Sequence, residues 1–225
     1  MPASNGDPEV DAGGVVAGFF AFTEITEPSA HRAYNEWHQL DHLPEQLPIP
    51  GISHGQRWVS TPRCREVSHW SVLDAGGSAD LSAAQYLTLY LMREPLDETL
   101  ALFYDLAVRL HDEDRFFPSR RALESGPLPV RATAAAPRVR VSAAAVPYRP
   151  NRGIYALVDN PTRDSDGRQT STLSKSADDL LQIDGVAGVW LFGPGDSRPQ
   201  DDRSQRDTGS TPLGTGAPLE AVVTI

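Results

Sequence analysis

Residues 34–45, Tyr-Asn-Glu-Trp-His-Gln-Leu-Asp-His-Leu-Pro-Glu, form the densest group of aromatic and proton-carrying side chains in this sequence. Ser29, just upstream, suits a helix N-cap, so we expect a helix from there to about His42. Pro44 disfavours helical geometry at the residue before it and should end the helix. All six histidines of the chain lie in its first half, so we expect any chemistry to be located there.

The patterns around this segment follow the order strand, helix, strand, strand, helix, strand. The apolar run at 15–25 predicts a strand that is buried on both faces near its centre. After the helix, a rigid turn at 47–51 leads into a second strand at about 52–60. The remaining predicted elements are a strand at 84–92, a helix at 96–111 and a strand at about 128–134. This order predicts an α+β fold of the ferredoxin-like kind.

The second half of the chain repeats the first in a degenerate form. Ile49-Pro50-Gly51-Ile52 matches Ile183-Asp184-Gly185-Val186, and each segment lies between a predicted helix and a predicted strand. The repeat stops before a second helix and a fourth strand. The expected organisation is a disordered lead at 1–14, a ferredoxin-like unit at 15–134, a linker at 135–152 and a truncated or incomplete second unit at 153–225.

The composition is acidic and poor in cysteine. The formal charge of −10 and the pI of about 5.0 argue against nucleic acid or an anionic membrane as the main partner. Cys64 is the only cysteine, so no intramolecular disulfide can form and a reducing compartment fits. The longest apolar run, 15–22, is too short to cross a bilayer and no basic leader is evident, so we expect a cytoplasmic protein. Residues 195–215, rich in Gly, Ser, Asp and Pro, predict a mobile loop.

The helix near residue 34 carries two different faces at about 100° per residue. Trp37 lies at their boundary, and the apolar face is expected to contact the sheet. One face holds Tyr34, His38, Asp41, His42 and Glu45, and the other holds Ala33, Leu40, Leu43 and Leu47. The polar face is either an ordinary solvated surface or part of a site. Tyr, Trp and two His are unusual choices for plain solvent, which favours a site.

His42 is the leading candidate for a catalytic acid or base, with His38 and Tyr34 assisting it. A histidine at a helix C-terminus lies near the negative end of the helix dipole, which favours its protonated form. The four-residue spacing of His38 and His42 can hold a metal, but no third ligand is clearly placed, so we predict no metal site. Candidate ligand-binding side chains are Trp37, His54, Trp58 and Tyr90, although aromatic residues on strands more often belong to the core.

The spacing Trp-x4-His-x-Pro, formed by Trp37, His42 and Pro44, resembles a pattern of the dimeric α+β barrel superfamily, which includes EthD-like proteins. In that superfamily two ferredoxin-like units pair their sheets into a barrel, and each ligand cavity lies between sheet and helices. Members include cofactor-free monooxygenases, lactone isomerases, polyketide cyclases, haem-dependent enzymes and stress proteins of unknown role. The resemblance implies that the two halves of this chain pair with each other, and a homodimer is a further option.

The sequence is compatible with two functions. The first is an enzyme without a cofactor that acts on a small apolar, aromatic or polyketide-like molecule, by proton transfer (isomerisation, cyclisation or dehydration) or by oxygenation. The second is a non-catalytic ligand-binding or assembly protein in which the same residues are structural. A pocket that closes around His42 would favour the enzyme, whereas His42 in solvent would favour the second function.

Overall fold

The computed structural model describes residues 12–68, 81–159, 162–163, 169–170, 173–193 and 220–224. This part of the chain has a mixed α+β fold, and all of its strand pairs are antiparallel. Of the predicted lead, residues 12–14 form a turn into the first strand and Ala12 is buried in the core. The rest of the lead and the predicted loop at 195–215 lie outside the described residues.

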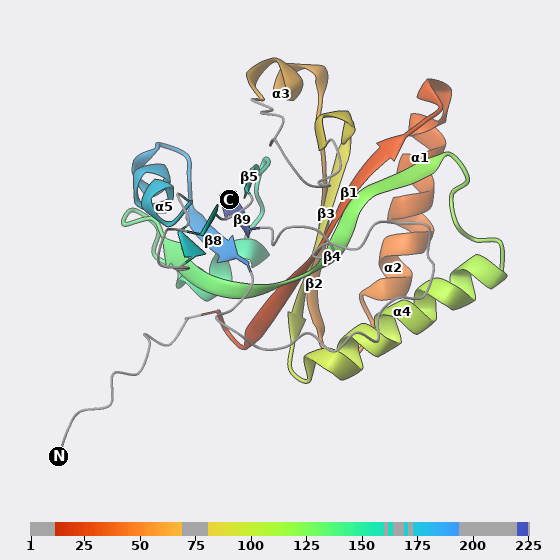
Figure 1. Cartoon of the computed structure of the whole chain (residues 1–225), viewed down its shortest axis with the longest axis horizontal. Helices are drawn as coiled ribbons and strands as arrows, with labels where there is room; N and C mark the ends of the chain where they lie inside the picture. Colours follow the sequence, from red (N-terminus) through yellow and green to blue (C-terminus); the bar gives the residue numbers. More distant parts are fainter. Residues whose placement is uncertain are drawn as a thin grey trace.

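The first half contains the elements that the sequence predicted, in the predicted order. They are β1 (Val15–Ile25), α1 (His31–Trp37), α2 (Leu43–Gln46), β2 (Ile52–Val59), β3 (Tyr86–Arg93), α4 (Leu96–Asp112) and β4 (Arg120–Ala135), with the short helix α3 (Pro62–Val67) between β2 and β3. Their strands pair in the order β2-β3-β1-β4. The helices α1, α2 and α4 lie together on one side of this sheet (Figure 1).

The strand β4 is much longer than its predicted range and connects the two halves of the chain. Its first part pairs with β1, and Val130–Ala135 pairs with β8 (Gly188–Phe192). The sheet then continues through β9 (Glu220–Thr224) to β5 (Tyr155–Asp159). The helix α5 (Leu173–Gln182) packs beside these strands, and β6 (Thr162–Arg163) and β7 (Gln169–Thr170) form a separate small ribbon.

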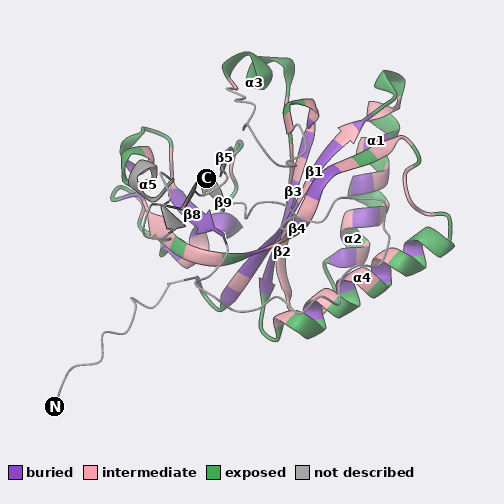
Figure 2. Cartoon of the chain, viewed as in Figure 1, coloured by how far each residue is buried: buried purple, intermediate pink, exposed green. Residues whose placement is uncertain are grey.

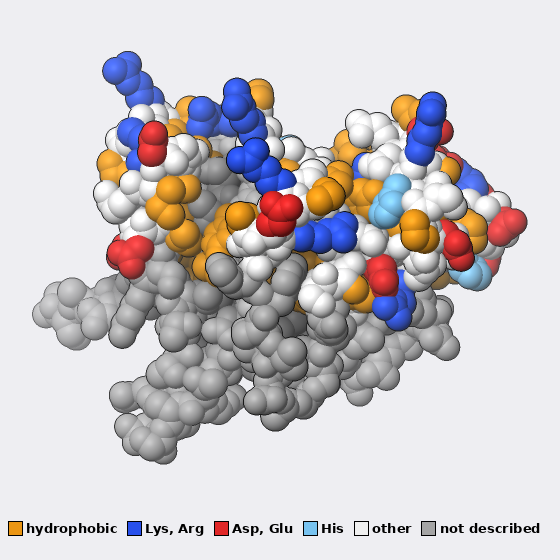
Figure 3. Space-filling model, turned by 90° about the horizontal axis from the view of Figure 1, so that it is seen from above, with side chains coloured by type: hydrophobic (Ala, Val, Ile, Leu, Met, Phe, Trp, Pro, Cys, Tyr) orange, Lys and Arg blue, Asp and Glu red, His pale blue; other side chains and the backbone are white. Residues whose placement is uncertain are grey.

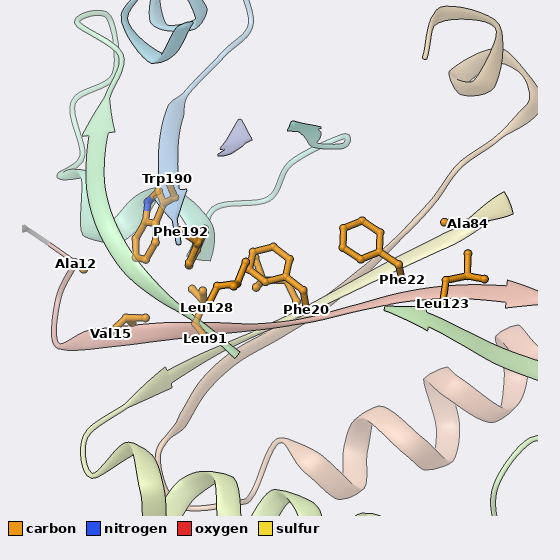
Figure 4. Close-up of a cluster of buried hydrophobic side chains, with 11 residues drawn as sticks. Ala12, Val15, Phe20, Phe22, Ala84, Leu91, Leu123, Leu128, Trp190 and Phe192 are labelled. Atoms are coloured by element: carbon orange, nitrogen blue, oxygen red, sulfur yellow. The ribbon is translucent and has the colours of Figure 1, made fainter. Parts of the chain in front are cut away.

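Alternate residues of β1 face two different environments, as the predicted two-sided burial requires. Phe19 packs on the helix side with Phe103 of α4, whereas Phe20 packs on the other side with Phe192 of β8. Figure 4 shows this second cluster, in which Trp190 and Phe192 lie over β1 and β3. Gly18 allows that approach, because a Cβ there would lie 2.7 Å from the Phe192 ring.

The helix that carries the two histidines does not end at His42, contrary to the sequence prediction. A π-helical turn, His38–His42, links α1 to α2, so the helix continues through Pro44 to Gln46. The predicted orientation of this helix was also wrong. Leu40 of the expected sheet-facing stripe is 77% exposed, while Tyr34, His38 and His42 are buried against the sheet. Figure 2 shows the buried face of this helix turned toward the strands.

Candidate functional site

A cavity of about 90 Å³ lies between the helix-facing side of the sheet and the helices α1, α2 and α4; we call it the helix–sheet cavity. Its walls come from β1, β3 and β4, from the helices, and from the segment after α4. The lining side chains that carry aromatic rings or polar groups are Phe19, Thr23, Tyr34, His38, His42, Gln46, Thr88, Tyr90, Phe103, Tyr104, Phe116, Arg120 and Ser125.

One helix supplies four of these side chains at a constant spacing of four residues. Tyr34, His38, His42 and Gln46 are all 9% exposed or less, although three of them carry groups that prefer water. In a regular α-helix, residues four apart rotate about 40° relative to one another, so such a row drifts off one face. The π-turn His38–His42 has more residues per turn and keeps the row facing the sheet. π-turns of this kind are frequent at functional sites.

His42 is held by its neighbours on the helix. The Trp37 indole stacks on the His42 imidazole, with ring centroids 4.5 Å apart and an interplanar angle of 22°. The Gln46 side-chain amide hydrogen-bonds the His42 ring, with 3.1 Å between Nε2 of each residue. With the amide N–H as donor, His42 Nε2 accepts and the ring proton lies on Nδ1. Nδ1 is buried without a hydrogen-bond partner, so it can serve a bound molecule.

His38 lies deeper in the same cavity. Its Nε2 is 3.3 Å from Thr88 Oγ1, and its ring centroid is 5.5 Å from that of His42. Burial, helped by the charges of Arg57 and Arg120, lowers the pKa of His38 to about 3. Burial also lowers the pKa of His42 well below its usual value, with smaller effects from Arg120 and His38. The expected protonation of His42 by the helix dipole is therefore wrong, because burial dominates and His42 lies inside the helix.

Two tyrosines complete the polar part of the cavity wall. The Tyr34 hydroxyl is hydrogen-bonded by Thr23 and Arg57, and burial raises the pKa of Tyr34. Burial raises the pKa of Tyr90 even more strongly, and its hydroxyl has no hydrogen-bond partner. Both phenols stay protonated near neutrality, so Tyr90 can donate a hydrogen bond to a ligand.

The predicted residues His54 and Trp58 do not join this group. On β2, Arg57 shares the helix side of the sheet with Tyr34, so His54 and Trp58 point to the opposite side. The Trp58 indole N–H donates to Asn151 Oδ1 at 3.1 Å, and the His54 ring packs edge-on against Tyr148 at 5.3 Å. Trp37, also predicted to contact a ligand, supports His42 and is not among the lining side chains.

The segment after α4 forms one wall of the cavity because Arg115 anchors it to the helix. The Arg115 guanidinium lies 2.6 Å from Asp41 and 2.8 Å from Glu45, and the Arg115 carbonyl accepts from the Trp37 indole at 2.7 Å. Asp41 and Glu45 thus bind the outer segment and do not face the cavity. Phe116, the next residue, lines the cavity against the His42 ring.

Of the residues that line the cavity, sequence reasoning identified Tyr34, His38, His42 and Tyr90 and missed the others, among them Gln46 and Arg120. Gln46 lies four residues after His42, and the spacing would have identified it if the helix had been continued past Pro44. Arg120 begins β4, eight residues before the predicted start of that strand at 128, so nothing in the sequence pointed to it.

Several other expectations can be compared with the described part of the chain. No group of three or more His, Cys, Asp or Glu side chains suited to a metal ion occurs within it. None of its helices is long and apolar enough to cross a membrane. On the coloured part of the face in Figure 3, which is the part that the structure describes, acidic and basic side chains are interspersed and form no single basic patch.

Comparison with known proteins does not assign this chain to a family. No protein-family model, curated protein or solved structure matches it.

Proposed function

We propose that this protein is a cofactor-independent enzyme that transfers a proton to or from a small molecule in the helix–sheet cavity. The observation that carries the proposal is that two buried, uncharged histidines line that cavity, and that one of them has an unpartnered ring nitrogen. A buried polar atom without a partner costs stability, so a ligand that satisfies it explains why such an atom is kept.

We further propose that residues 15–134 form a ferredoxin-like unit and that residues 153–225 form a partial second one. The order β2-β3-β1-β4 supports the first, and the order β8-β9-β5 in the second half matches β2-β3-β1. Gly51 and Gly185, matched in the sequence, have nearly equal left-handed φ values of 90° and 89°, which supports a degenerate repeat. Pairing of β4 with β8 joins the two sheets, as the resemblance to dimeric α+β barrels implies. We also propose a cytoplasmic location, and a possible homodimer through the edge of β2.

His42 is the proposed acid–base group, and Gln46 is its positioning residue. When the Gln46 N–H donates to Nε2, His42 Nδ1–H can donate a hydrogen bond to a substrate oxygen. If the amide turns over, Gln46 Oε1 accepts from Nε2–H and Nδ1 becomes a base with a free lone pair. His38, 5.5 Å away between ring centroids, lines the same cavity and can contact the opposite end of the same substrate.

The size of the cavity limits the substrate. A volume of about 90 Å³ is small compared with the roughly 300–1,000 Å³ of typical ligand pockets. An engineered cavity of about 150 Å³ binds benzene, so this one holds the reactive end of a substrate and little more. A larger aromatic or polyketide-like body would need to displace side chains at the rim, such as Phe116.

The direct test is proton exchange at carbon. Small ketones and aromatic ketones are incubated with the protein in D2O, and deuterium incorporation is followed by NMR. Wild type should accelerate exchange of at least one member of the panel, and His42→Ala should lower that rate by roughly 10²-fold or more. His111→Ala is the matched control, because its side chain is exposed on α4 and does not line the cavity.

The competing function is that of a non-catalytic binding protein. It predicts no histidine-dependent exchange for any compound, together with a large loss of folding stability in His42→Ala. That result would show that His42 is a packing residue and would refute the enzymatic proposal.

A further inference from the structure

The side chains that line the helix–sheet cavity include a positive charge but no negative charge. Arg120 lies in its wall, and none of the lining residues is Asp or Glu. No ion pair within the described ranges includes Arg120. Its neighbour Arg121 provides the contrast, because Arg121 points outward and pairs with Glu24. One arginine of the pair is neutralised at the surface, and the other brings its charge into the cavity.

The Arg120 guanidinium acts on most of the polar groups around it. Its charge lowers the pKa values of His38 and His42 and works against the raised pKa values of Tyr34 and Tyr90. Burial lowers the pKa of Arg120 itself, but an arginine stays charged in proteins. The guanidinium carbon of Arg120 lies over the Phe116 ring, 5.2 Å from its centroid. A second cation, Arg57, lies over the Tyr34 ring at 5.2 Å, which adds to the positive potential.

Hydrogen-bond donors complement this charge. The Tyr90 hydroxyl and His42 Nδ1 belong to lining residues, and neither has a partner. Arg120 is partly buried, and a cation withdrawn from water costs stability unless an anion or equivalent acceptors satisfy it. Guanidinium bonds to organic oxyanions are short, strong and often bidentate. Aromatic side chains beside these donors, such as Phe19 and Phe103, provide apolar contacts for the carbon atoms next to the anion.

We propose that the helix–sheet cavity binds an organic oxyanion, with Arg120 as its counter-ion and with Tyr90 and His42 as hydrogen-bond donors. The inference rests on the proposed function, since it names the substrate class of the same site. The oxyanion is either a carboxylate carried by the substrate or a phenolate or enolate. A bound anion next to His42 also favours the protonated imidazole, so it prepares His42 to receive a proton.

Two pairs of probes test the inference by NMR titration of the full chain, at a pH where the acids are ionised. Benzoate is compared with benzamide, and a nitrophenolate with its methyl ether. The anion of at least one pair should bind wild type more tightly than its neutral counterpart. Preference within the first pair identifies a carboxylate site, and preference within the second identifies a phenolate or enolate site. Equal binding within both pairs, or no binding of any probe at millimolar concentration, would overturn the inference.

Substitution of Arg120 then tests whether its positive charge binds the anion. Arg120→Gln should weaken the preferred anion roughly 10- to 100-fold, as expected for loss of a charge-assisted hydrogen bond. Arg121→Gln is the matched control and should bind as wild type does. Thermal unfolding of Arg120→Gln then distinguishes an anion-binding Arg120 from a structural one. Loss of an unpaired cation should leave the melting temperature unchanged or raise it, whereas a structural Arg120 predicts a lower melting temperature with anion binding intact.

The failure of this inference can be distinguished from the failure of the proposed function. If deuterium exchange depends on His42 but binding shows no preference for anions, the enzymatic proposal stands and the substrate is neutral. If anions bind through Arg120 but no exchange depends on His42, the cavity is an anion-binding site without catalysis.

Discussion

Acid should destabilise this protein through His38, because the folded state holds that ring uncharged. The folded pKa of His38 is about 3, against 6.5 for an unperturbed histidine, and burial is the main cause. Below pH 6.5 the unfolded chain takes up a proton at this position that the folded chain refuses. The folded pKa is depressed, so stability is greatest above about pH 6.5 and falls as the pH is lowered toward 3.

The expected loss of unfolding free energy follows from the difference between the folded and unfolded pKa values of His38. At pH 5 the difference between the two pKa values removes about 2 kcal/mol of unfolding free energy relative to pH 7.5. The His38 side chain is buried, at 3% exposure for the residue, so this figure needs no discount for solvent screening. The depressed pKa of His42 acts in the same direction and adds to the loss.

The assay is urea unfolding at pH 7.5 and pH 5, followed by tryptophan fluorescence. His38→Gln should lose about 2 kcal/mol less than wild type between the two pH values, because glutamine has no proton to gain. Comparing the variants removes the contribution of carboxylates that both share. His111→Gln, changed at an exposed site, should keep the wild-type difference. An equal loss in wild type and His38→Gln would refute the reasoning and show that His38 can be protonated in the folded state.

Two further substitutions test the packing, both by urea unfolding at pH 7.5. Gly18→Ala should cost about 1–3 kcal/mol through overpacking, since the new Cβ would lie 2.7 Å from the Phe192 ring, whereas Gly153→Ala, with no atom within 4 Å, should have little effect. Leu40→Gln should change stability by less than about 0.5 kcal/mol because Leu40 is 77% exposed, while Leu110→Ala, at a residue 1% exposed, should cost about 2–5 kcal/mol.

Periodicity was sufficient to predict most elements of the first half. The strands β1, β2 and β3 and the helix α4 lie within a few residues of their predicted ranges. Each has a strong apolar pattern whose period does not depend on distant contacts. In α4, for example, Phe103 and Leu110 recur at helical spacing in the sequence, and both are buried.

The strand β4 could not be predicted in full because its first part contains strong turn signals. Gly126, Pro127 and Pro129 interrupt any strand pattern, and proline cannot donate a ladder hydrogen bond. The structure accommodates them because β8 pairs with β4 only from Val130 onward, so the prolines lie where one edge of β4 is not paired with β8. Missing this part of the strand also meant missing Arg120, which it directs into the cavity wall.

The sheet-facing side of the helix that carries His38 and His42 was predicted wrongly because this helix is not a regular α-helix. Its π-turn contains one residue more than an α-helical turn. Tyr34 and Gln46 are twelve positions apart, which at 3.6 residues per turn overshoots three turns by about 120°. Eleven positions would overshoot by only about 20°. A regular helix therefore groups Asp41 and Glu45 with Tyr34, as the sequence analysis expected. The π-turn His38–His42 absorbs one residue, so that His42 and Gln46 take those places instead.

This interpretation predicts that the helix tolerates a deletion. Removing exposed Gln39 should convert the π-turn into α-helix and leave Tyr34, His38, His42 and Gln46 on the sheet-facing side, so folding should be preserved. The matched control is deletion of exposed Asp105 in α4, a regular α-helix in which the loss of one residue rotates Leu106 and Leu110 by about 100° away from the core. Urea unfolding should show a cooperative transition for the first deletion and a severely destabilised chain for the second. A Gln39 deletion as damaging as the Asp105 deletion would show that the π-turn is required for folding. It would then not be an inserted residue that serves to present the two histidines to the cavity.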